Sequence, residues 1–587
     1  MKLIFRYMRR YAPTIALAVC LKLVGTMLEL SLPYILEHMI DVVVPQGNMP
    51  QVLRFGALMF AAALGTWLFN VMANRTAIHN AHRVSYNVRQ DLFAKTANLS
   101  GKQFDSFGLP SLISRMTSDS YNVQAAAQQL QSLCIRAPMM LFGGLFMTLS
   151  MDPALAMILV LMLPLLLAVV LTVCSRGIPM FRTVQQRLDD VVRIMRENIT
   201  GIRVVKALSK TEYEKRRFAG VNREMRRSDV RASTMMAVPG PFMQLCLNAG
   251  LTVVVVYGAY RVNAGLTKPG VILAFLTYFN MIAMGVMGLS RIFISMSKAS
   301  ASANRIDAVL QTSTDQQILP AAEALQPSGE GFIRFENVSF RYGAAEDEAA
   351  DAAAFAGGSR ANALEDITFT LQKGESLGII GPTGCGKTTI INLLMRFYDA
   401  GSGGVFVDGR DVRCYEKDEL HRKFGVVFQN DMIFQDTMRQ NIVFGRGLSD
   451  EAIRAAVEDA QAAEFVDELP EGLLYEAAIK GANLSGGQKQ RLLVARALAG
   501  DPEILVLDDS SSALDYRTDA AMRRAIAARH PDTTTILIAQ RVSSVMNMTH
   551  ILVMDEGRCI GFGSHEQLLQ SCPAYRQIYQ TQMGAMA

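Results

Sequence analysis

The sequence predicts two domains of different class: a membrane-spanning all-α domain in the first half of the chain and an α/β domain in the second. Hydrophobic residues make up 50% of the 587 residues and charged residues only 19%, and the apolar excess lies between residues 14 and 296. Beyond residue 332, short apolar stretches typical of buried strands alternate with amphipathic stretches typical of helices. A membrane domain followed by an α/β domain is therefore expected.

Six long apolar segments lie in the first domain. They cover residues 14–36, 52–73, 129–150, 154–175, 240–262 and 271–295. About 20 helical residues cross the ~30 Å hydrocarbon layer of a bilayer, so each segment predicts one transmembrane helix. The first segment is too long for a secretory signal and lacks a small-residue cleavage site, so we interpret it as a permanent span. The transmembrane domain is expected to cover residues 1–311.

The cationic residues predict the orientation of these helices. Lys and Arg gather before the first segment and in the two long connections that follow the second and fourth segments, whereas the opposite turns are short and nearly uncharged. The positive-inside rule then places both termini in the cytoplasm, for a multi-pass protein of the inner or plasma membrane. Each long connection, folded into two helices of about 20 residues, would project ~30 Å from the bilayer. Their tips are expected at residues 103–115 and 200–218.

Ionisable residues occur inside the predicted spans. Lys22 and Glu29 lie in the first span and Arg136 in the third. Because Lys22 and Glu29 are seven residues apart, they share a helix face and could pair. Ionisable groups in hydrocarbon usually face the interior of a helix bundle, so bonding between helices and contact with a substrate are equal alternatives.

Composition also divides the rest of the chain. Residues 312–331 are polar and contain proline, which predicts a linker before a second domain at residues 332–587. Within that domain, residues 343–362 are acidic and rich in alanine, which predicts a flexible insertion between two strands. The eight cysteines show no C-x-x-C spacing, so neither disulfides nor a thiolate metal site is indicated. The net charge of +5 comes largely from the cytoplasmic connections and does not indicate nucleic-acid binding.

A phosphate-binding pattern lies in the second domain. Gly381–Thr389 fills every fixed position of G-x-x-x-x-G-K-[ST], between a predicted strand at Ser376–Ile380 and a predicted helix at Thr389–Phe397. Backbone N–H groups at such a strand-to-helix turn can surround a polyphosphate. Lys387 would reach the β- and γ-phosphates and the Thr388 hydroxyl would bind Mg²⁺, so ATP and Mg²⁺ are the predicted ligands. The residues expected to bind the nucleotide here are Gly381, Thr383, Gly384, Cys385, Gly386, Lys387, Thr388 and Thr389.

Two further motifs follow in the order of a known family. A hydrophobic strand at Glu503–Asp508 can place Asp508 near the water shell of Mg²⁺, with Asp509 toward the attacking water. Between the two motifs lies Leu484–Gln488, which reads LSGGQ. With these three motifs in this order, nearly the whole chain resembles a half-transporter of the ATP-binding cassette (ABC) exporters. The resemblance implies an all-α six-helix transmembrane domain with long cytoplasmic helical extensions, followed by an α/β P-loop nucleotide-binding domain.

The resemblance implies roles for more residues. Tyr342 would stack on adenine, and Gln429 would join Thr388 and Asp508 as a ligand of Mg²⁺. Asp515 would lie in the loop that crosses a dimer interface, and Leu109–Arg115 and Ala207–Glu214 would be coupling helices, the second docking on the partner's nucleotide-binding domain. The signature residues, which would act in trans on the nucleotide of an opposing subunit, are Leu484, Ser485, Gly486, Gly487 and Gln488.

Two residues depart from the family pattern. Asp509 stands where a glutamate usually acts as the general base, and its side chain is one methylene shorter. Gln540 stands where a histidine usually contacts the γ-phosphate, and a neutral amide carries no positive charge. A misplacement of ~1 Å can cost about 10²-fold in rate, and lost general-base assistance about 10² to 10⁴. Because LSGGQ is intact, these departures predict an impaired site in one half of a heterodimer whose other half is a different polypeptide. A third departure is Ile479, in the loop before the signature, where the family often has an acid. The resemblance therefore does not establish the coupling contact that this acid would make.

The predicted function is a subunit of an ATP-driven exporter that moves amphipathic small molecules, lipids or peptides outward by alternating access. The expected partners are a second ABC half-transporter, membrane lipids and the amphipathic substrate, and not nucleic acid. An ATP-gated channel, a regulatory ABC subunit and a homodimeric exporter with slow ATPase activity are the alternatives. A soluble cassette ATPase is disfavoured by the six spans.

Overall fold

The computed structural model describes residues 1–313, 315–320, 322–343, 362–509 and 513–584. The chain forms two compact units. Met1–Asn98 and Pro110–Thr312 make the first unit, and Leu99–Leu109 with Ser313–Ala587 make the second. Apart from its first and last residues, the predicted insertion at 343–362 lies outside the described residues.

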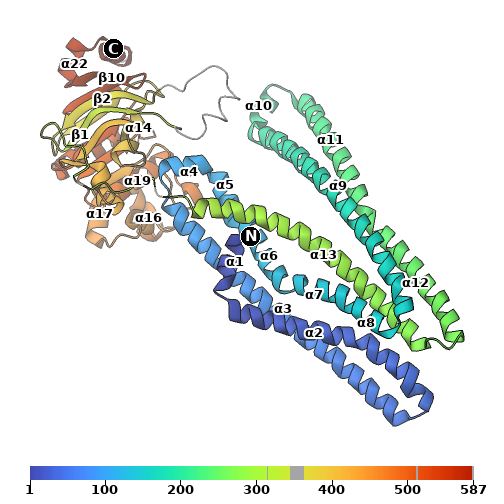
Figure 1. Cartoon of the computed structure of the whole chain (residues 1–587). Coiled ribbons are helices and arrows are strands. Elements are labelled where there is room, and N and C mark those ends of the chain that lie inside the picture. The colour runs from blue at the N-terminus through green and yellow to red at the C-terminus, as the bar shows by residue number, and fades with distance from the viewer. Residues whose placement is uncertain (314, 321, 344–361, 510–512, 585–587) are drawn as a thin grey trace. The chain divides into compact units, whose positions relative to one another are not determined.

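The first unit is all-α (Figure 1). Short π-helical segments at Met39–Val43, Arg115–Asp119 and Met139–Gly143, and a 3₁₀ turn at Val44–Gln46, interrupt or end its helices. The helices are α1 (Lys2–Arg9), α2 (Ala12–His38), α3 (Met49–Ala97), α5 (Leu109–Ser114), α6 (Ser120–Gln131), α7 (Leu133–Pro138), α8 (Gly144–Met151), α9 (Pro153–Thr200), α10 (Ile202–Ala207), α11 (Thr211–Ala237), α12 (Pro239–Asn263) and α13 (Pro269–Leu310).

Each predicted span falls within a helical stretch of this unit. The stretches long and apolar enough to cross a membrane are Ala12–Gln46, Met49–Ala97, Leu109–Met151, Thr211–Asn263 and Pro269–Leu310. The remaining predicted span, residues 154–175, occupies the start of α9, where Pro153–Leu166 is a shorter apolar stretch. The helical membrane domain is confirmed.

Among the described helices, α3, α9 and α13 are much longer than a span needs. They have 49, 48 and 42 residues, which corresponds to ~60–75 Å at 1.5 Å per residue. α9 and α11 run side by side and are joined by the short helix α10 (Figure 1). Long helical extensions beyond the ~30 Å apolar layer are therefore present.

The ionisable residues of the spans bond between helices. Arg136 Nη2 of α7 donates to Glu29 Oε1 of α2 at 2.7 Å. Lys22 Nζ of α2 donates to Asn70 Oδ1 at 2.7 Å and to Asn74 Oδ1 at 3.2 Å, both on α3. Lys22 and Glu29, which could have paired by their spacing, do not pair, because each side chain reaches a partner on a neighbouring helix. Of the two alternatives, the structure shows bonding between helices.

The second unit is an α/β structure with two sheets. Its strands are β1 (Ile333–Phe340), β2 (Leu364–Leu371), β3 (Ser376–Ile380), β4 (Ser402–Val407), β5 (Arg410–Asp411), β6 (Phe424–Val427), β7 (Ile504–Asp508), β8 (Thr534–Ile538), β9 (His550–Asp555) and β10 (Arg558–Gly563). The first sheet is antiparallel, in the order β2-β1-β4-β5. The second has the order β10-β9-β3-β8-β7-β6 and is parallel except for the pair of β9 and β10.

The same unit contains helices as well as strands. They are α4 (Gly101–Phe107), α14 (Lys387–Leu394), α15 (Lys417–Arg422), α16 (Met438–Val443), α17 (Asp450–Asp459), α18 (Ala463–Glu468), α19 (Gly486–Leu498), α20 (Tyr516–Arg529), α21 (Val542–Val545), α22 (His565–Ser571) and α23 (Pro573–Met583), with 3₁₀ turns at Val412–Cys414, Gly472–Leu474 and Ile479–Gly481. Successive residues of a strand point to opposite faces. In β7, Leu505 and Leu507 accordingly pack in one hydrophobic cluster, while Ile504 and Val506 pack with α14 in another.

Candidate nucleotide-binding site

Sheet topology brings the predicted site residues to one edge. β6, β7, β3 and β8 are parallel to their neighbours, so their carboxyl ends lie at the same edge of the sheet. The Gly-rich loop follows β3, Asp508 ends β7, Gln540 lies two residues after β8, and Gln429 lies two residues after β6. Residues that are up to 159 positions apart in the sequence therefore converge on one site.

The Gly-rich loop requires its glycines. Gly384 and Gly386 have φ angles of 87° and 96°, in the left-handed region that side chains disfavour. A Cβ on Gly381 would lie 2.2 Å from the Met554 carbonyl oxygen, and one on Gly386 would lie 2.4 Å from that of Ala363. Strand, loop and helix follow in the predicted order. The helix, however, is Lys387–Leu394 rather than Thr389–Phe397, because the loop ends at Gly386 and the backbone leaves the helical region at Arg396.

Lys387 and Cys385 lie at the start of α14. Lys387 Nζ donates to the carbonyl oxygens of Gly381 at 2.8 Å and Pro382 at 2.7 Å, so the ammonium curves over the loop. Cys385 is buried, and burial raises the pKa of its thiol, against the opposing effect of the Lys387 charge. A protonated, buried thiol is a poor nucleophile, which agrees with its position as a variable residue of the motif.

Two acids end β7 and have different partners. Thr388 Oγ1 donates to Asp508 Oδ2 at 2.8 Å, and Gln540 Nε2 donates to Asp509 Oδ2 at 3.1 Å. Burial is the largest cause that raises the pKa of both carboxyl groups, with the bonds from Thr388 and Gln540 working against it. Asp509 has a φ of 49°, which turns its side chain out of the strand direction. One acid thus meets the nucleotide loop and the other meets the segment after β8.

That segment after β8 is fastened from two sides. Gln582 of α23 donates from Nε2 to the Gln540 carbonyl at 2.9 Å, and its Oε1 accepts from the Val542 N–H at 2.7 Å. Arg523 of α20 donates from Nη1 to the Ser544 carbonyl at 2.8 Å. Sequence reasoning missed Gln582 and Arg523, because no local pattern marks a side chain that bonds to the backbone of a distant loop.

The LSGGQ segment forms a helix start of its own. Ser485 caps α19: its Oγ accepts from the Gln488 N–H at 3.3 Å, while Gln488 Oε1 accepts from the Ser485 N–H at 2.9 Å. This reciprocal pair is a capping box. Gln490 Oε1 accepts from the Ala513 N–H at 3.0 Å, which joins α19 to the loop before Asp515. The signature is therefore bonded to the loop before Asp515. The bonds described above instead join Thr388 to Asp508 and Gln540 to Asp509, beside Lys387.

Asp515 is an N-cap. It accepts from the Thr518 N–H at 2.9 Å and from the Thr518 hydroxyl at 2.8 Å, at the start of α20. These bonds lower the pKa of the exposed Asp515 carboxyl. Residues 510–512, which include the first residue of the predicted interface loop, lie outside the described residues. The cap orients α20, which also carries Arg523.

Comparison with known proteins assigns the family. The model of the ABC transporter transmembrane region matches residues 15–286, and the ABC transporter model matches residues 364–512. The chain is 31% identical over 579 residues to an uncharacterized ABC transporter ATP-binding protein, YfiB of Bacillus subtilis, covering 98% of each chain. The chain belongs to the ABC transporter family.

Two further relatives of this ABC transporter bear on its architecture. It is 31% identical over 536 residues to a protein named ATP-dependent lipid A-core flippase from Methylobacillus flagellatus, covering 90% of this chain and 87% of the relative. A solved structure of a bacterial Atm1-family ABC exporter with ATP bound superposes with a TM-score of 0.80 at 23% identity, over 97% and 99% of the two chains. The fold is that of an exporter half-transporter, and the protein is a multi-pass integral membrane protein.

As an ABC transporter, the chain couples the binding and hydrolysis of Mg²⁺·ATP to transport. The residues present fit these ligands. The Thr388 hydroxyl and the Asp508 carboxylate meet at 2.8 Å beside the loop, and the loop approaches its neighbours too closely for side chains. Among the described residues there is no cluster of three or more His, Cys, Asp or Glu suited to a metal. Mg²⁺ takes one or two carboxylates together with water and phosphate oxygens, and Asp508 offers such a carboxylate.

Tyr342 and Gln429 lie at the margins of the transporter's site. The Tyr342 hydroxyl donates to Thr389 Oγ1 at 3.2 Å and accepts from Asn392 Nδ2 at 3.1 Å, which fixes the ring beside α14. Its ring also meets that of Tyr398 edge-on, with centroids 5.1 Å apart. Gln429 is exposed, and the register of Val427 with Leu507 places it at the edge where Asp508 lies.

The part of the first long connection that packs with the α/β unit is called the docking segment here, and α4 within it the docking helix. This segment differs in position from the predicted first coupling helix. Leu99–Leu109, which contains α4, belongs to the α/β unit, whereas the prediction was Leu109–Arg115. Gly101 N donates to the Phe397 carbonyl at 3.1 Å, and a Cβ there would lie 2.7 Å from Tyr398 Cζ. Only a glycine permits this approach, so the docked turn comes earlier in the chain than the Gly-Pro break suggested. The second predicted tip forms α10 and the turn at Leu208–Lys210.

Proposed function

We propose that this chain is the half of a heterodimeric exporter whose own ATP site is degenerate. The observation that carries the proposal is the 3.1 Å hydrogen bond from Gln540 Nε2 to Asp509 Oδ2. Asp509 stands at the position of the general base. Its side chain is one methylene shorter than that of glutamate, and one carboxylate oxygen already accepts a hydrogen bond from the Gln540 amide. At the position of the γ-phosphate contact, the same amide brings no charge.

The impairment is one of geometry. Burial raises the pKa of Asp509, and a raised pKa by itself makes a carboxylate a stronger base. The shorter side chain nevertheless holds the carboxylate back from the attacking water, and one of its oxygens already accepts from Gln540. A neutral amide also gives less stabilisation to the charge that develops on the transferred phosphoryl group. Nucleotide binding should survive these changes while hydrolysis is slow.

The proposal gives the remaining residues the following roles. Lys387 and the backbone of Gly381–Thr389, which includes Thr383, Cys385 and Thr389, would surround the polyphosphate. Thr388, Gln429 and Asp508 would bind Mg²⁺, and Tyr342 would stack on adenine. The signature at Leu484–Gln488 would close over the nucleotide of the partner, and Asp515 would lie at the interface between the halves.

The cargo is proposed to be amphipathic: a small molecule, a lipid or a peptide moved outward. One relative is named for flipping a lipid, and both termini are proposed to face the cytoplasm from the distribution of Lys and Arg. A flux measurement in sealed vesicles separates an exporter from an ATP-gated channel or a regulatory subunit. An exporter accumulates its solute against a gradient, whereas a channel only equilibrates it.

Restoring the family residues tests the degenerate site. The purified chain in lipid vesicles is expected to hydrolyse ATP slowly, and the double variant Asp509→Glu with Gln540→His is expected to be about 10²-fold faster or more. Lys387→Ala serves as the negative control that gives the background ATPase rate, because it removes the proposed contact with the phosphates. A wild-type chain that turns over as fast as the double variant would refute the degenerate site.

Affinity purification of the tagged chain from its native membrane tests the assembly. A second, different half-transporter recovered in equal amount supports the heterodimer. Recovery of this chain alone, with slow ATPase activity, would favour a homodimer with two impaired sites.

A further inference from the structure

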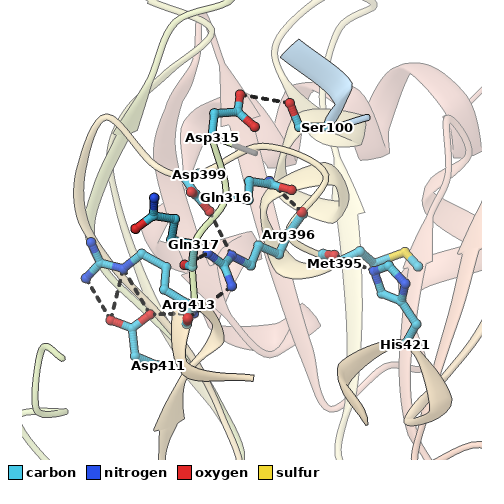
Figure 2. A network of polar contacts seen from close by, with 10 residues as sticks. All are labelled: Ser100, Asp315, Gln316, Gln317, Met395, Arg396, Asp399, Asp411, Arg413 and His421. Carbon is cyan, nitrogen blue, oxygen red and sulfur yellow. Dashed lines mark hydrogen bonds and ion pairs between the residues drawn. The ribbon is translucent and has the colours of Figure 1, made fainter. Parts of the chain in front are cut away.

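The segment between the two units is bonded along its length to the α/β unit. We call Ser313 and Asp315–Leu319 the strap; residue 314 lies outside the described residues. Gln103 Nε2 of α4 donates to the Ser313 carbonyl at 2.6 Å, and Ser100 Oγ donates to Asp315 Oδ2 at 2.9 Å (Figure 2 shows the second bond). The Leu319 N–H donates to the Arg413 carbonyl at 3.0 Å. A segment expected to be a linker is therefore fixed at several points.

Arg396 is the centre of this network (Figure 2). Its guanidinium donates to Asp399 Oδ1 at 3.0 Å, to the Arg413 carbonyl at 3.0 Å and to the Gln317 carbonyl at 2.7 Å. In return, its own carbonyl accepts from Gln316 Nε2 at 2.8 Å. Arg396 and Gln316 are 4% and 7% exposed. A buried guanidinium is costly to leave unpaired, so the strap and Arg396 hold each other in one arrangement.

Neighbouring bonds extend the same rigid block. The Arg413 guanidinium is bonded through two nitrogens to the Asp411 carboxylate, which fixes the carbonyl that Arg396 and Leu319 share. His421 Nε2 donates to the Met395 carbonyl at 2.9 Å, so the residue before Arg396 is also held. The turn therefore has bonded partners in addition to the strap and α4.

The docking helix α4 meets the same turn. Gly101 N donates to the Phe397 carbonyl, and Tyr398 Oη donates to Asp105 Oδ2 at 2.5 Å. Burial and the Asp105 carboxylate raise the pKa of the Tyr398 phenol, so this hydroxyl stays a donor at physiological pH. Residues 396–398 thus accept contacts from α4 and from the strap. The Ser100–Asp315 bond links the two contacting segments directly.

This turn directly follows the helix of the nucleotide loop. α14 has eight residues and begins with Lys387 and Thr388, so about 12 Å of rigid helix separates the turn from the phosphate-binding end. Both segments that reach the turn are continuous in the chain with long helices of the membrane unit: α3 ends at Ala97 and α13 ends at Leu310. The turn after α14 is therefore contacted by two segments that each continue along the chain into a long helix of the membrane unit.

We propose that the strap is a second coupling path between the nucleotide loop and the membrane helices, parallel to the docking helix α4. Gln316 and Asp315 are its positioning residues: Gln316 acts through the Arg396 backbone and α14, and Asp315 acts by joining the strap to α4. This path does not depend on the degenerate site and applies equally to a homodimer or a heterodimer.

Two adjacent glutamines provide a matched test. Gln316→Ala removes the amide that donates to the Arg396 carbonyl. Gln317→Ala is the control, because the Gln317 side chain is exposed and points away from Arg396 in Figure 2, and its useful group is the backbone carbonyl, which alanine keeps. Both full-length variants are placed in vesicles of phosphatidylethanolamine and phosphatidylglycerol. Hydrogen exchange of α3 and α13 is measured with and without Mg²⁺·ATP, together with the affinity for ATP.

Coupling and simple fastening give different results. One lost hydrogen bond shifts an equilibrium by about fivefold, so Gln316→Ala is expected to lose at least half of the ATP-induced change in exchange of the membrane helices. Its ATP affinity should stay within about twofold of the wild-type value, since the phosphate contacts at Lys387 are intact. Gln317→Ala should match the wild type in both. An unchanged exchange response in Gln316→Ala would overturn the proposal, as would equal losses of response and ATP affinity.

A second pair of variants keeps the test decisive if Gln316→Ala does not fold. Asp315→Ala and Ser100→Ala each break the bond between the strap and α4. Asp315 is exposed, whereas Ser100 is buried and its hydroxyl also caps α4, so Ser100→Ala removes that cap as well. Under the proposal Asp315→Ala reduces the exchange response, and adding it to Ser100→Ala reduces the response no further, because the two residues act through one contact. Additive losses or no loss would overturn it.

Discussion

Replacing Gln582 with alanine should release the segment that carries Gln540. Gln582 makes two hydrogen bonds to that segment, one at 2.9 Å to the Gln540 carbonyl and one at 2.7 Å from the Val542 N–H. At about 1 kcal/mol net for each bond, their loss costs about 2 kcal/mol, or a factor of about 30 in the population of the ordered segment. If the Gln540 amide must be ordered to retain nucleotide, Mg²⁺·ATP should leave the site up to about 30-fold faster.

The assay is the release of a fluorescent ATP analogue from the assembled transporter, chased with excess ATP. Gln580→Ala is the control, because Gln580 lies on the exposed side of the same helix two residues earlier. Gln582→Glu removes only one of the two bonds. The new carboxylate can still accept from the Val542 N–H but cannot donate to the Gln540 carbonyl, so a release rate between those of the wild type and Gln582→Ala is expected. Equal release rates for Gln582→Ala and Gln580→Ala would show that the segment is ordered without α23, and the reasoning would fail.

Two further predictions follow from the nucleotide loop and its acid. Gly386→Ala should abolish ATP binding measured by titration, because φ is 96° and a Cβ would lie 2.4 Å from a backbone oxygen, whereas Gly447→Ala, in open space, should bind normally. Burial raises the pKa of Asp508 above its ordinary 3.8, so the folded state binds this proton more tightly and loses stability as pH rises through that range. Asp508→Asn should therefore raise the melting temperature without nucleotide at pH 7, lose that gain as pH falls toward about 4, and abolish hydrolysis. A lower melting temperature at pH 7 would contradict the burial argument.

Much of this architecture was predictable because its signals are local. The membrane helices follow from runs of apolar residues about 20 long, and the nucleotide loop follows from glycines that only a strand-to-helix turn requires. β3 was predicted at its observed limits, Ser376–Ile380. The end of α14 was not, because it is set by the left-handed backbone of Arg396 just beyond Leu394, a residue whose bonded partners lie far away in the sequence.

The errors share a physical cause. Spacing on one helix indicated that Lys22 and Glu29 could pair, but Lys22 bonds to α3 and Glu29 to α7. The first docking segment was placed at a Gly-Pro break, but the close contact at Gly101 decided its position. In each case the deciding interaction joins residues far apart in sequence. Pattern reasoning has access only to neighbours along the chain.

Two glutamine side chains bond to backbone segments on either side of the nucleotide loop and its helix. Gln582 fastens the segment beside Asp509, and Gln316 fastens the turn at the far end of α14. An amide both donates and accepts but carries no charge, so these contacts specify geometry without titrating near neutral pH. They are also insensitive to ionic strength, unlike exposed ion pairs, which salt screens over about 8–10 Å. Coupling through such contacts should therefore persist at salt concentrations that weaken the exposed Arg and Glu pairs of α9 and α11.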